Sequence, residues 1–201
     1  MIATRFKKTE KDFSSKIAML KALGVKEGSR ILDYGASWGY GTWQLREAGF
    51  EAIGYELSRP RARYAREMLN TPVKDDVNHL TGRFDVFFSS HVLEHLSSPL
   101  TAFEVAMRWL RPGGMIVALT PNGSEACRQA NPDLYRTSWG RLHPLYLDDA
   151  FYLRHFRDHP IMLSSSPYFS PYPLHDIQRW NKQTRLVLDL AQRELLVAIL
   201  L

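Results

Sequence analysis

The chain has little cysteine and no long apolar run. One cysteine, Cys127, among 201 residues cannot form an internal disulfide and lacks the partners of a cysteine metal cluster. The longest apolar stretch, residues 195–201, is far too short to span a bilayer. No hydrophobic region follows the basic residues near the start, so we expect no secretory signal. The simplest prediction is a cytoplasmic protein without a membrane span.

The excess of charge is also small. The chain has 26 basic and 21 acidic residues, a net charge of +5, which invites an anionic partner but is weak support for nucleic-acid binding. Its composition, 45% hydrophobic and 23% charged, is ordinary for a soluble globular protein. The length suffices for one domain with a sizeable core and barely for two. We therefore expect a single domain over residues 1–201.

Short apolar stretches alternate with amphipathic ones over the first 120 residues. Ser58 is expected to be the N-cap of one of the helices, and the Arg-Pro-Gly-Gly stretch at 111–114 is expected to be a turn. Strands that alternate with helices imply βαβ crossovers and a mostly parallel sheet. The predicted strands are 30–35, 51–58, 71–77, 84–90 and 115–120, and the predicted helices are 10–24, 40–50, 59–70 and 100–110.

The last third has a different composition. Residues 121–173 are rich in Pro, Tyr, Trp, Ser and His, with one helix expected at 147–156. Residues 160–168 are a candidate sixth strand. Residues 193–200 fit either a seventh strand or an amphipathic helix, because periodicity does not separate the two for so short a run.

A glycine-rich loop, RILDYGASWGYG, occupies residues 30–41. Glycine removes the side chain where a chain turns tightly or where a ligand lies against the backbone. A loop between a strand and a helix also presents backbone N–H groups and a helix N-terminus to a ligand. An acidic residue about 20 positions later, at the end of the next strand, is suited to ribose hydroxyls. Glu56 meets that requirement for Gly35, so the pair predicts a nucleoside-binding site.

The pattern Asp33-x-Gly35-x-Ser37-x-Gly39 resembles the first motif of class I S-adenosylmethionine-dependent methyltransferases, although Ser37 stands where the family usually has glycine. Residues 75–80, 84–96 and 109–122 resemble the third-strand, fourth-strand and fifth-strand motifs of that family, in its order. The resemblance implies an α/β, Rossmann-like, doubly wound fold. Its mostly parallel seven-stranded sheet would have the order 3-2-1-4-5-7-6 and helices on both faces. The implied cofactor is S-adenosylmethionine, with S-adenosylhomocysteine as product.

The same resemblance implies a cofactor-binding half over about 25–122. The glycine loop would receive the methionine portion, with Asp33 orienting its ammonium group, and Glu56 would accept from the ribose hydroxyls. Asp76 would accept from the adenine amino group, beside the Val77 N–H, and the end of the fourth strand would face the sulfonium. The implied cofactor-binding residues are Asp33, Gly35, Ala36, Ser37, Gly39, Glu56, Asp76, Val77, Ser89 and His91.

The segment at about 123–175 is expected to cap the acceptor site and exclude water. Tyr135, Trp139, His143 and Tyr146 suit an apolar pocket with polar tips. The expected reaction is in-line attack of an acceptor oxygen, favoured over nitrogen or carbon, on the sulfonium methyl group, with a small-molecule, sugar or lipid-linked acceptor. His143 or His95 would be the base if one is needed, because the histidine pKa lies near working pH. The other interpretation is that His95 caps or packs locally and that His143 is an ordinary loop residue.

Three other chemistries compete with this interpretation. The stretch His91 to His95 matches the H-x-x-E-H metallopeptidase pattern. That chemistry needs both histidines on one helix face, and His91 directly follows a predicted strand, so we expect no metal. A dehydrogenase is disfavoured because Asp33 would lie near a phosphate. A non-catalytic cofactor-binding protein stays open, because a fold does not determine a function.

Nucleic-acid methylation is the closest rival. Three arginines at helical spacing are able to contact phosphates, but such charge runs more often form a solvated face. No appended RNA-binding domain is visible. A small-molecule, sugar or lipid-linked acceptor is therefore favoured over nucleic acid. The three arginines are Arg59, Arg63 and Arg66.

Overall fold

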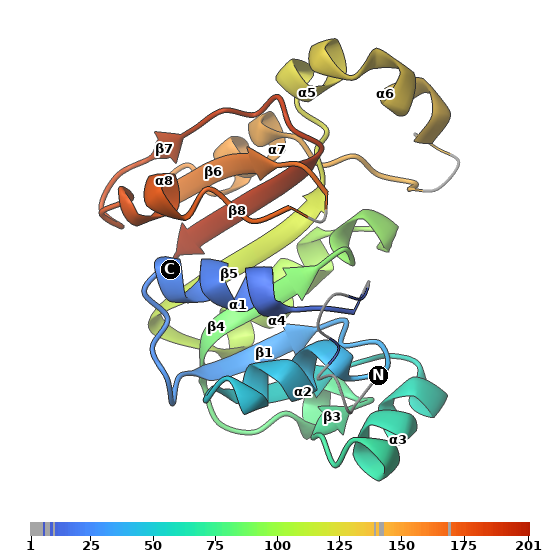
Figure 1. The fold of residues 1–201 in the computed structure, drawn as a ribbon. Coiled ribbons are helices and arrows are strands. Elements are labelled where there is room, and N and C mark those ends of the chain that lie inside the picture. The colour runs from blue at the N-terminus through green and yellow to red at the C-terminus, as the bar shows by residue number, and fades with distance from the viewer. Residues whose placement is uncertain (1–5, 7–8, 10, 139, 141–142, 169) are drawn as a thin grey trace.

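A computed structural model describes residues 6, 9, 11–138, 140, 143–168 and 170–201, without the side chains of 134, 135 and 138. One eight-stranded sheet runs through it in the order β3-β2-β1-β4-β5-β8-β6-β7 (Figure 1). The strands are β1 Arg30–Tyr34, β2 Glu51–Tyr55, β3 Val73–Lys74, β4 Phe84–Ser90, β5 Leu110–Pro121, β6 Ile161–Ser166, β7 Leu186–Val187 and β8 Glu194–Leu200.

Helices connect these strands and cover both faces of the sheet (Figure 1). No helix within the described ranges is long and apolar enough to cross a membrane. The α-helices are α1 Ser14–Ala22, α2 Tyr40–Glu47, α3 Arg59–Met68, α4 Leu100–Trp109, α5 Glu125–Ala130, α6 Pro132–Ser138, α7 Asp149–His155 and α8 Leu174–Gln178. Two 3-10 turns, η2 Val77–His79 and η3 Leu93–His95, follow β3 and β4.

The predicted Rossmann-like fold and strand order are confirmed, with one strand added. The sixth and seventh predicted strands are β6 and β8, and β8 runs antiparallel to both of its neighbours, β5 and β6. The predicted count of seven is one too low, because β7 pairs with β6 at the edge of the sheet. A two-residue strand has no period, so the sequence contains no signal for it.

Residues 194–200 form a strand and not an amphipathic helix. Glu194 to Ile199 are all buried, which is the pattern of a strand covered on both faces. A helix would have exposed one side of such a run. The tertiary environment therefore decides an assignment that periodicity left open.

The predicted turn at 111–114 lies inside β5 as an irregularity. Phe84 pairs with Leu110 whereas Val86 pairs with Met115, so the register shifts between them. Gly113 has φ of 75° and donates its N–H to the Leu201 carbonyl at 2.9 Å. Helices α5 and α6 fall where we predicted no helix.

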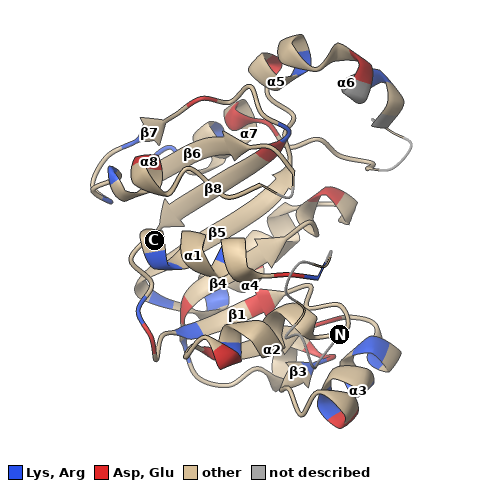
Figure 2. Cartoon of the chain, in the orientation of Figure 1, with Lys and Arg blue, Asp and Glu red and all other residues tan. Residues whose placement is uncertain are grey.

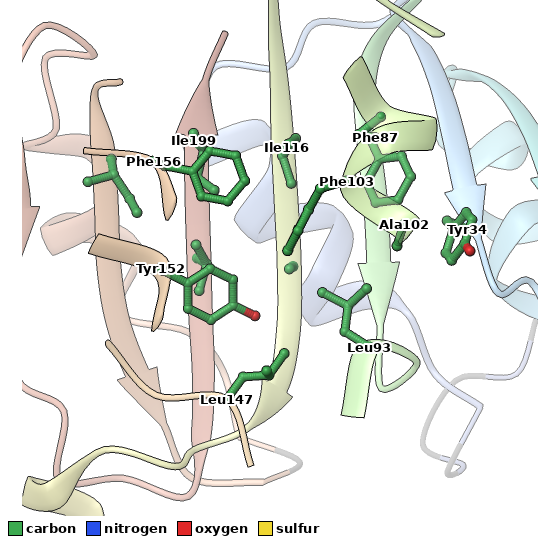
Figure 3. Close-up of a cluster of buried hydrophobic side chains, with 14 of the residues drawn as sticks. Tyr34, Phe87, Leu93, Ala102, Phe103, Ile116, Leu147, Tyr152, Phe156 and Ile199 are labelled. Carbon is green, nitrogen blue, oxygen red and sulfur yellow. The ribbon is translucent and has the colours of Figure 1, made fainter. Parts of the chain in front are cut away.

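Alternate residues of the central strands pack into two hydrophobic layers. Ile31, Val86 and Val117 face α1, α2 and α8, whereas Leu32, Phe87 and Ile116 face α4 and α7. Charged residues are absent from the middle of β5, β6 and β8 (Figure 2). Figure 3 shows the second layer, where Phe103 of α4, Tyr152 of α7 and Phe156, which directly follows α7, pack against the sheet.

Helices cover both faces of the sheet, so the strand ends are the candidate position for a ligand. Strands β1, β2, β4 and β5 are parallel, so their carboxyl ends share one edge. Tyr34 pairs with Tyr55 on one side and with Ser89 on the other. In open α/β sheets the ligand crevice lies at this edge, and the predicted site residues follow it.

Candidate functional site

The loop after β1 has left-handed backbone at three alternate positions. Gly35 has φ of 84°, Ser37 of 50° and Gly39 of 80°. This region costs an L-residue roughly 1–2 kcal/mol and glycine almost nothing. The departure at Ser37, where the family usually has glycine, is therefore a strained substitution at a position whose backbone favours glycine.

The two glycines also permit close approach of neighbouring segments. A Cβ atom on Gly35 would lie 2.2 Å from Val92 Cγ2, and one on Gly39 would lie 2.5 Å from Ala65 Cβ. We predicted that a methionine moiety would occupy the space beside Gly35. Val92 occupies the side on which a Cβ would stand, so this glycine lets the segment after β4 pack onto the loop, and the contact of its backbone with the methionine moiety stays a prediction.

Asp33 is a buried carboxylate below the loop, 4% exposed. Thr42, one turn into α2, donates its hydroxyl to Asp33 Oδ2 at 2.6 Å. Burial raises the pKa of Asp33 to about 6, against the opposing effects of Thr42 and of the positive charge on Lys16. A carboxylate held this way is suited to a cationic partner, because burial penalises its charge until a positive group neutralises it.

Glu56 joins the loop to the start of α3. Its two carboxylate oxygens accept from the Ser37 N–H at 2.9 Å and from the Ser58 N–H at 2.8 Å. Ser58 is the N-cap of α3, as predicted, although its side chain makes no capping hydrogen bond. Each carboxylate oxygen has a second lone pair, so Glu56 is able to accept from ligand hydroxyls as well.

Asp76 and Val77 lie at the neighbouring strand end. Tyr55 pairs with Lys74, and the Glu56 N–H donates to the Lys74 carbonyl at 2.9 Å. Glu56 and Asp76, which follow β2 and β3, therefore lie at neighbouring strand ends. Asp76 caps η2 by accepting from the Asn78 N–H at 2.8 Å, and this hydrogen bond lowers the pKa of its carboxyl. Val77 is the first residue of η2.

Ser89 is fully buried in β4, with its hydroxyl unpartnered within the described ranges. His91, two residues on, has φ of 55° and a side chain in a network that the sequence did not indicate. Its Nε2 lies 2.6 Å from Glu194, and its Nδ1 lies 3.4 Å from Glu94. Burial alone would lower the pKa of His91, but the two carboxylates raise it to about 9.

The two histidines predicted as candidate bases lie together. The rings of His95 and His143 have centroids 5.2 Å apart. A backbone hydrogen bond from Leu145 N–H to the Glu94 carbonyl at 3.3 Å brings the later segment back to η3. Burial lowers the pKa of His143. Of the aromatic residues predicted for the cap, Tyr146 lies beside His143, while Trp139 and the side chain of Tyr135 lie outside the described residues.

The metallopeptidase geometry is not formed. His91 follows β4 in a bend, and Leu93–His95 is a single 3-10 turn, so the two histidines do not share a helix face. The side chain of Glu94 is fully buried. The H-x-x-E-H pattern therefore lacks the structural context that its chemistry requires.

The arginines of α3 favour the solvated-face interpretation. Arg66 donates to the Val73 carbonyl at 2.7 Å and lies 3.3 Å from Asp75, so its charge is used within the chain. Blue and red segments both occur on α3 in Figure 2. One of the three predicted arginines is therefore engaged within the chain, while Arg59 and Arg63 are exposed.

A comparison with known sequences identifies the family of this chain. A family model described as a methyltransferase domain matches residues 7–187. The ubiquinone biosynthesis O-methyltransferase of Alkalilimnicola ehrlichii is 30% identical over 112 residues, covering 51% of this chain and 45% of that protein. Phosphoethanolamine N-methyltransferase 1 of Arabidopsis thaliana is 26% identical over 137 residues, covering 63% and 26%. The chain spans less than half the length of these curated relatives.

Solved structures show the same fold. The magnesium protoporphyrin IX methyltransferase of Synechocystis PCC 6803, with bound S-adenosylhomocysteine, has a TM-score of 0.60 at 15% identity, covering 92% of this chain and 80% of that one. A possible histamine N-methyltransferase of Thermotoga maritima has a TM-score of 0.63 at 13% identity, covering 94% and 89%. Because the family model matches most of the chain, the chain belongs to the methyltransferase-domain family, and the solved structures show the class I fold that its motifs predicted.

Proposed function

We propose that this chain binds S-adenosylmethionine at the carboxyl edge of its sheet and transfers the methyl group to an oxygen of a small-molecule, sugar or lipid-linked acceptor. One observation carries the proposal. Asp33 and Glu56, at the ends of the adjacent parallel strands β1 and β2, flank a loop with left-handed backbone. In this proposal Asp33 meets the ammonium group of the cofactor and Glu56 meets its ribose.

The remaining contacts follow from the neighbouring strand ends. Asp76 would accept from the adenine amino group and the Val77 N–H would meet a ring nitrogen. Backbone atoms of Ser89 and His91 would face the sulfonium. Ala36 and Gly39 would lie against the methionine portion. In this proposal residues 1–201 form one domain, with the cofactor bound by about 25–122 and the acceptor by about 123–175.

The transfer itself needs alignment more than a reactive side chain. A lone pair on the acceptor oxygen forms the new bond to the methyl carbon. The electrons of the broken carbon–sulfur bond remain on sulfur, which becomes the neutral thioether of S-adenosylhomocysteine. The hydroxyl proton passes to His95 or His143. Holding the reactants in line supplies most of the acceleration, and a base adds to it.

The setting of the reaction is part of the same proposal. The curated relatives are named for an O-methyltransferase and an N-methyltransferase, so both kinds of acceptor atom belong in a screen. We favour oxygen, a cytoplasmic location in keeping with the single cysteine, and no nucleic-acid acceptor, because Arg66 is engaged within the chain.

Calorimetry with S-adenosylhomocysteine tests the cofactor site. Glu56→Gln should weaken binding roughly tenfold, since an unpaired ligand hydroxyl costs about 1–3 kcal/mol. Glu67→Gln, an exposed change of the same kind on α3, should leave affinity unchanged. Equal affinity in all three proteins would remove Glu56 from the site, and no binding to wild type would overturn the proposed function. A methyl-transfer screen over hydroxyl and amine acceptors then tests the acceptor class.

A further inference from the structure

Three side chains with metal-binding atoms converge beside the cofactor loop. Glu94 and His95 come from η3, directly after β4, and His143 comes from the segment that returns to it. One ligand atom from each of the three lies within 4.8 Å of the other two. The backbone hydrogen bond from the Leu145 N–H to the Glu94 carbonyl supports this arrangement, because Leu145 lies only two residues after His143.

The carboxylate in this cluster is buried without a hydrogen bond, and one of its oxygens has no charged partner in the described residues. Glu94 is 0% exposed, and within the part of the chain that the structure describes neither of its oxygens accepts a hydrogen bond. His143 Nδ1 is also buried without a hydrogen-bond partner there. His91 Nδ1 stands 3.4 Å from Glu94 Oε1 and forms an ion pair with it, while its Nε2 lies 2.6 Å from Glu194. Buried polar atoms normally have a hydrogen-bond partner or bind a metal, and in the described residues Glu94 Oε2 and His143 Nδ1 have neither.

We propose that Glu94, His95 and His143 bind one divalent transition-metal cation. Two imidazole nitrogens and one carboxylate oxygen form a set that suits zinc and its neighbours better than magnesium or calcium. Donors at about 2.0–2.2 Å from a tetrahedral cation lie roughly 3.4 Å apart, so a small contraction of the cluster completes the site. The His95 side chain is 51% exposed, which leaves an entry path and a free coordination position.

The position of the cluster indicates what the cation would do in methyl transfer. This part of the inference rests on the proposed function. Val92, two residues before Glu94, contacts the Gly35 position of the cofactor loop. A cation here would bind the acceptor hydroxyl and lower its pKa, and the proton would leave to solvent water. The oxygen lone pair then forms the bond to the methyl carbon while sulfur keeps the carbon–sulfur electrons. The acceptor class is accordingly a hydroxyl able to coordinate a metal, and the two histidines act as ligands in place of a base.

Direct binding tests the site without any acceptor. The full chain, stripped with a chelator, would be dialysed against Zn²⁺, with Co²⁺ absorption as a second probe of coordination. We expect one equivalent bound by wild type and at least tenfold weaker binding by Glu94→Gln, His95→Ala and His143→Ala. His175→Ala, a histidine on α8 outside the cluster, is the matched control and should bind as wild type does.

The outcomes separate this inference from the proposed function. Wild type that binds S-adenosylhomocysteine but no Zn²⁺ would overturn the metal site alone. Wild type that binds neither would overturn both. Metal binding that survives His95→Ala and His143→Ala would also overturn the assignment. If the buried change Glu94→Gln prevents folding, His95→Ala keeps the test decisive, because the His95 side chain is half exposed.

Discussion

Replacement of Asp33 by asparagine should stabilise the ligand-free protein and weaken the cofactor complex. In the folded chain burial raises the pKa of Asp33 to about 6, from an ordinary value of 3.8. A difference of about 2 units corresponds to roughly 3 kcal/mol between the two protonation states. The folded state binds the proton more tightly than the unfolded state, so this group destabilises the fold increasingly as pH rises from about 4 to about 6, and fully above that.

The asparagine side chain in the Asp33→Asn variant would carry no charge at any pH and would still accept from the Thr42 hydroxyl through its amide oxygen. Urea unfolding at a series of pH values measures the effect. The variant should gain up to about 3 kcal/mol over wild type at pH 7 and little or nothing at pH 4. Asp158→Asn, whose side chain is 82% exposed, is the control and should show no such divergence.

The same substitution should reduce affinity for S-adenosylhomocysteine at pH 7. A hydrogen bond to a charged partner contributes about 1.5–3 kcal/mol, so calorimetry should show a loss of at least tenfold. Wild-type affinity should rise with pH through about 6, as Asp33 ionises, and that rise should be missing in the variant. If Asp33→Asn is less stable than wild type by the same amount at pH 4 and pH 7, the carboxylate is a structural anchor and the reasoning fails.

Three further substitutions test the loop and the histidine network. Ser37→Gly should stabilise the fold by up to about 1 kcal/mol in thermal melts, since φ of 50° strains serine; an unchanged or lower Tm would contradict the strain. Gly35→Ala should destabilise it by about 2 kcal/mol or more, because the new Cβ would lie 2.2 Å from Val92 Cγ2. A Val92→Ala background should relieve part of that loss, and no relief would argue against the clash. Tyr172→Phe should cost about 1–3 kcal/mol in urea unfolding, because its hydroxyl donates to buried Glu194 at 2.6 Å; a loss below about 0.5 kcal/mol would show that Glu194 does not depend on it.

Much of the cofactor side follows from the sequence because its signals are local. The alternation of strands and helices implies a parallel sheet, and the parallel sheet brings the ends of β1, β2 and β4 to one edge. Asp33 and Glu56 each lie within one or two residues of a strand end, so their positions follow once the strands are assigned. The glycines at 35 and 39 mark a loop, and the structure shows that its backbone is left-handed at both positions.

Other features depend on contacts between residues far apart in the chain. Residues 194–200 are a strand only because β5 and β6 pair with them on both sides and helices cover both faces. His91 meets Glu194, which lies 103 positions later, through the antiparallel entry of β8. Likewise His143 meets Glu94 and His95 only because the returning segment hydrogen-bonds to η3.

The physical reason is the range over which each interaction acts. Backbone preference, capping and hydrophobic period depend on a few neighbouring residues, so the sequence by itself determined the class of fold, the glycine loop and the acidic residues after β1 and β2. Burial and pairing depend on which segments the folded chain brings together. Only the tertiary structure therefore decided that Asp33 is buried with a raised pKa, that His91 is held by Glu194, and that Glu94 faces two histidines.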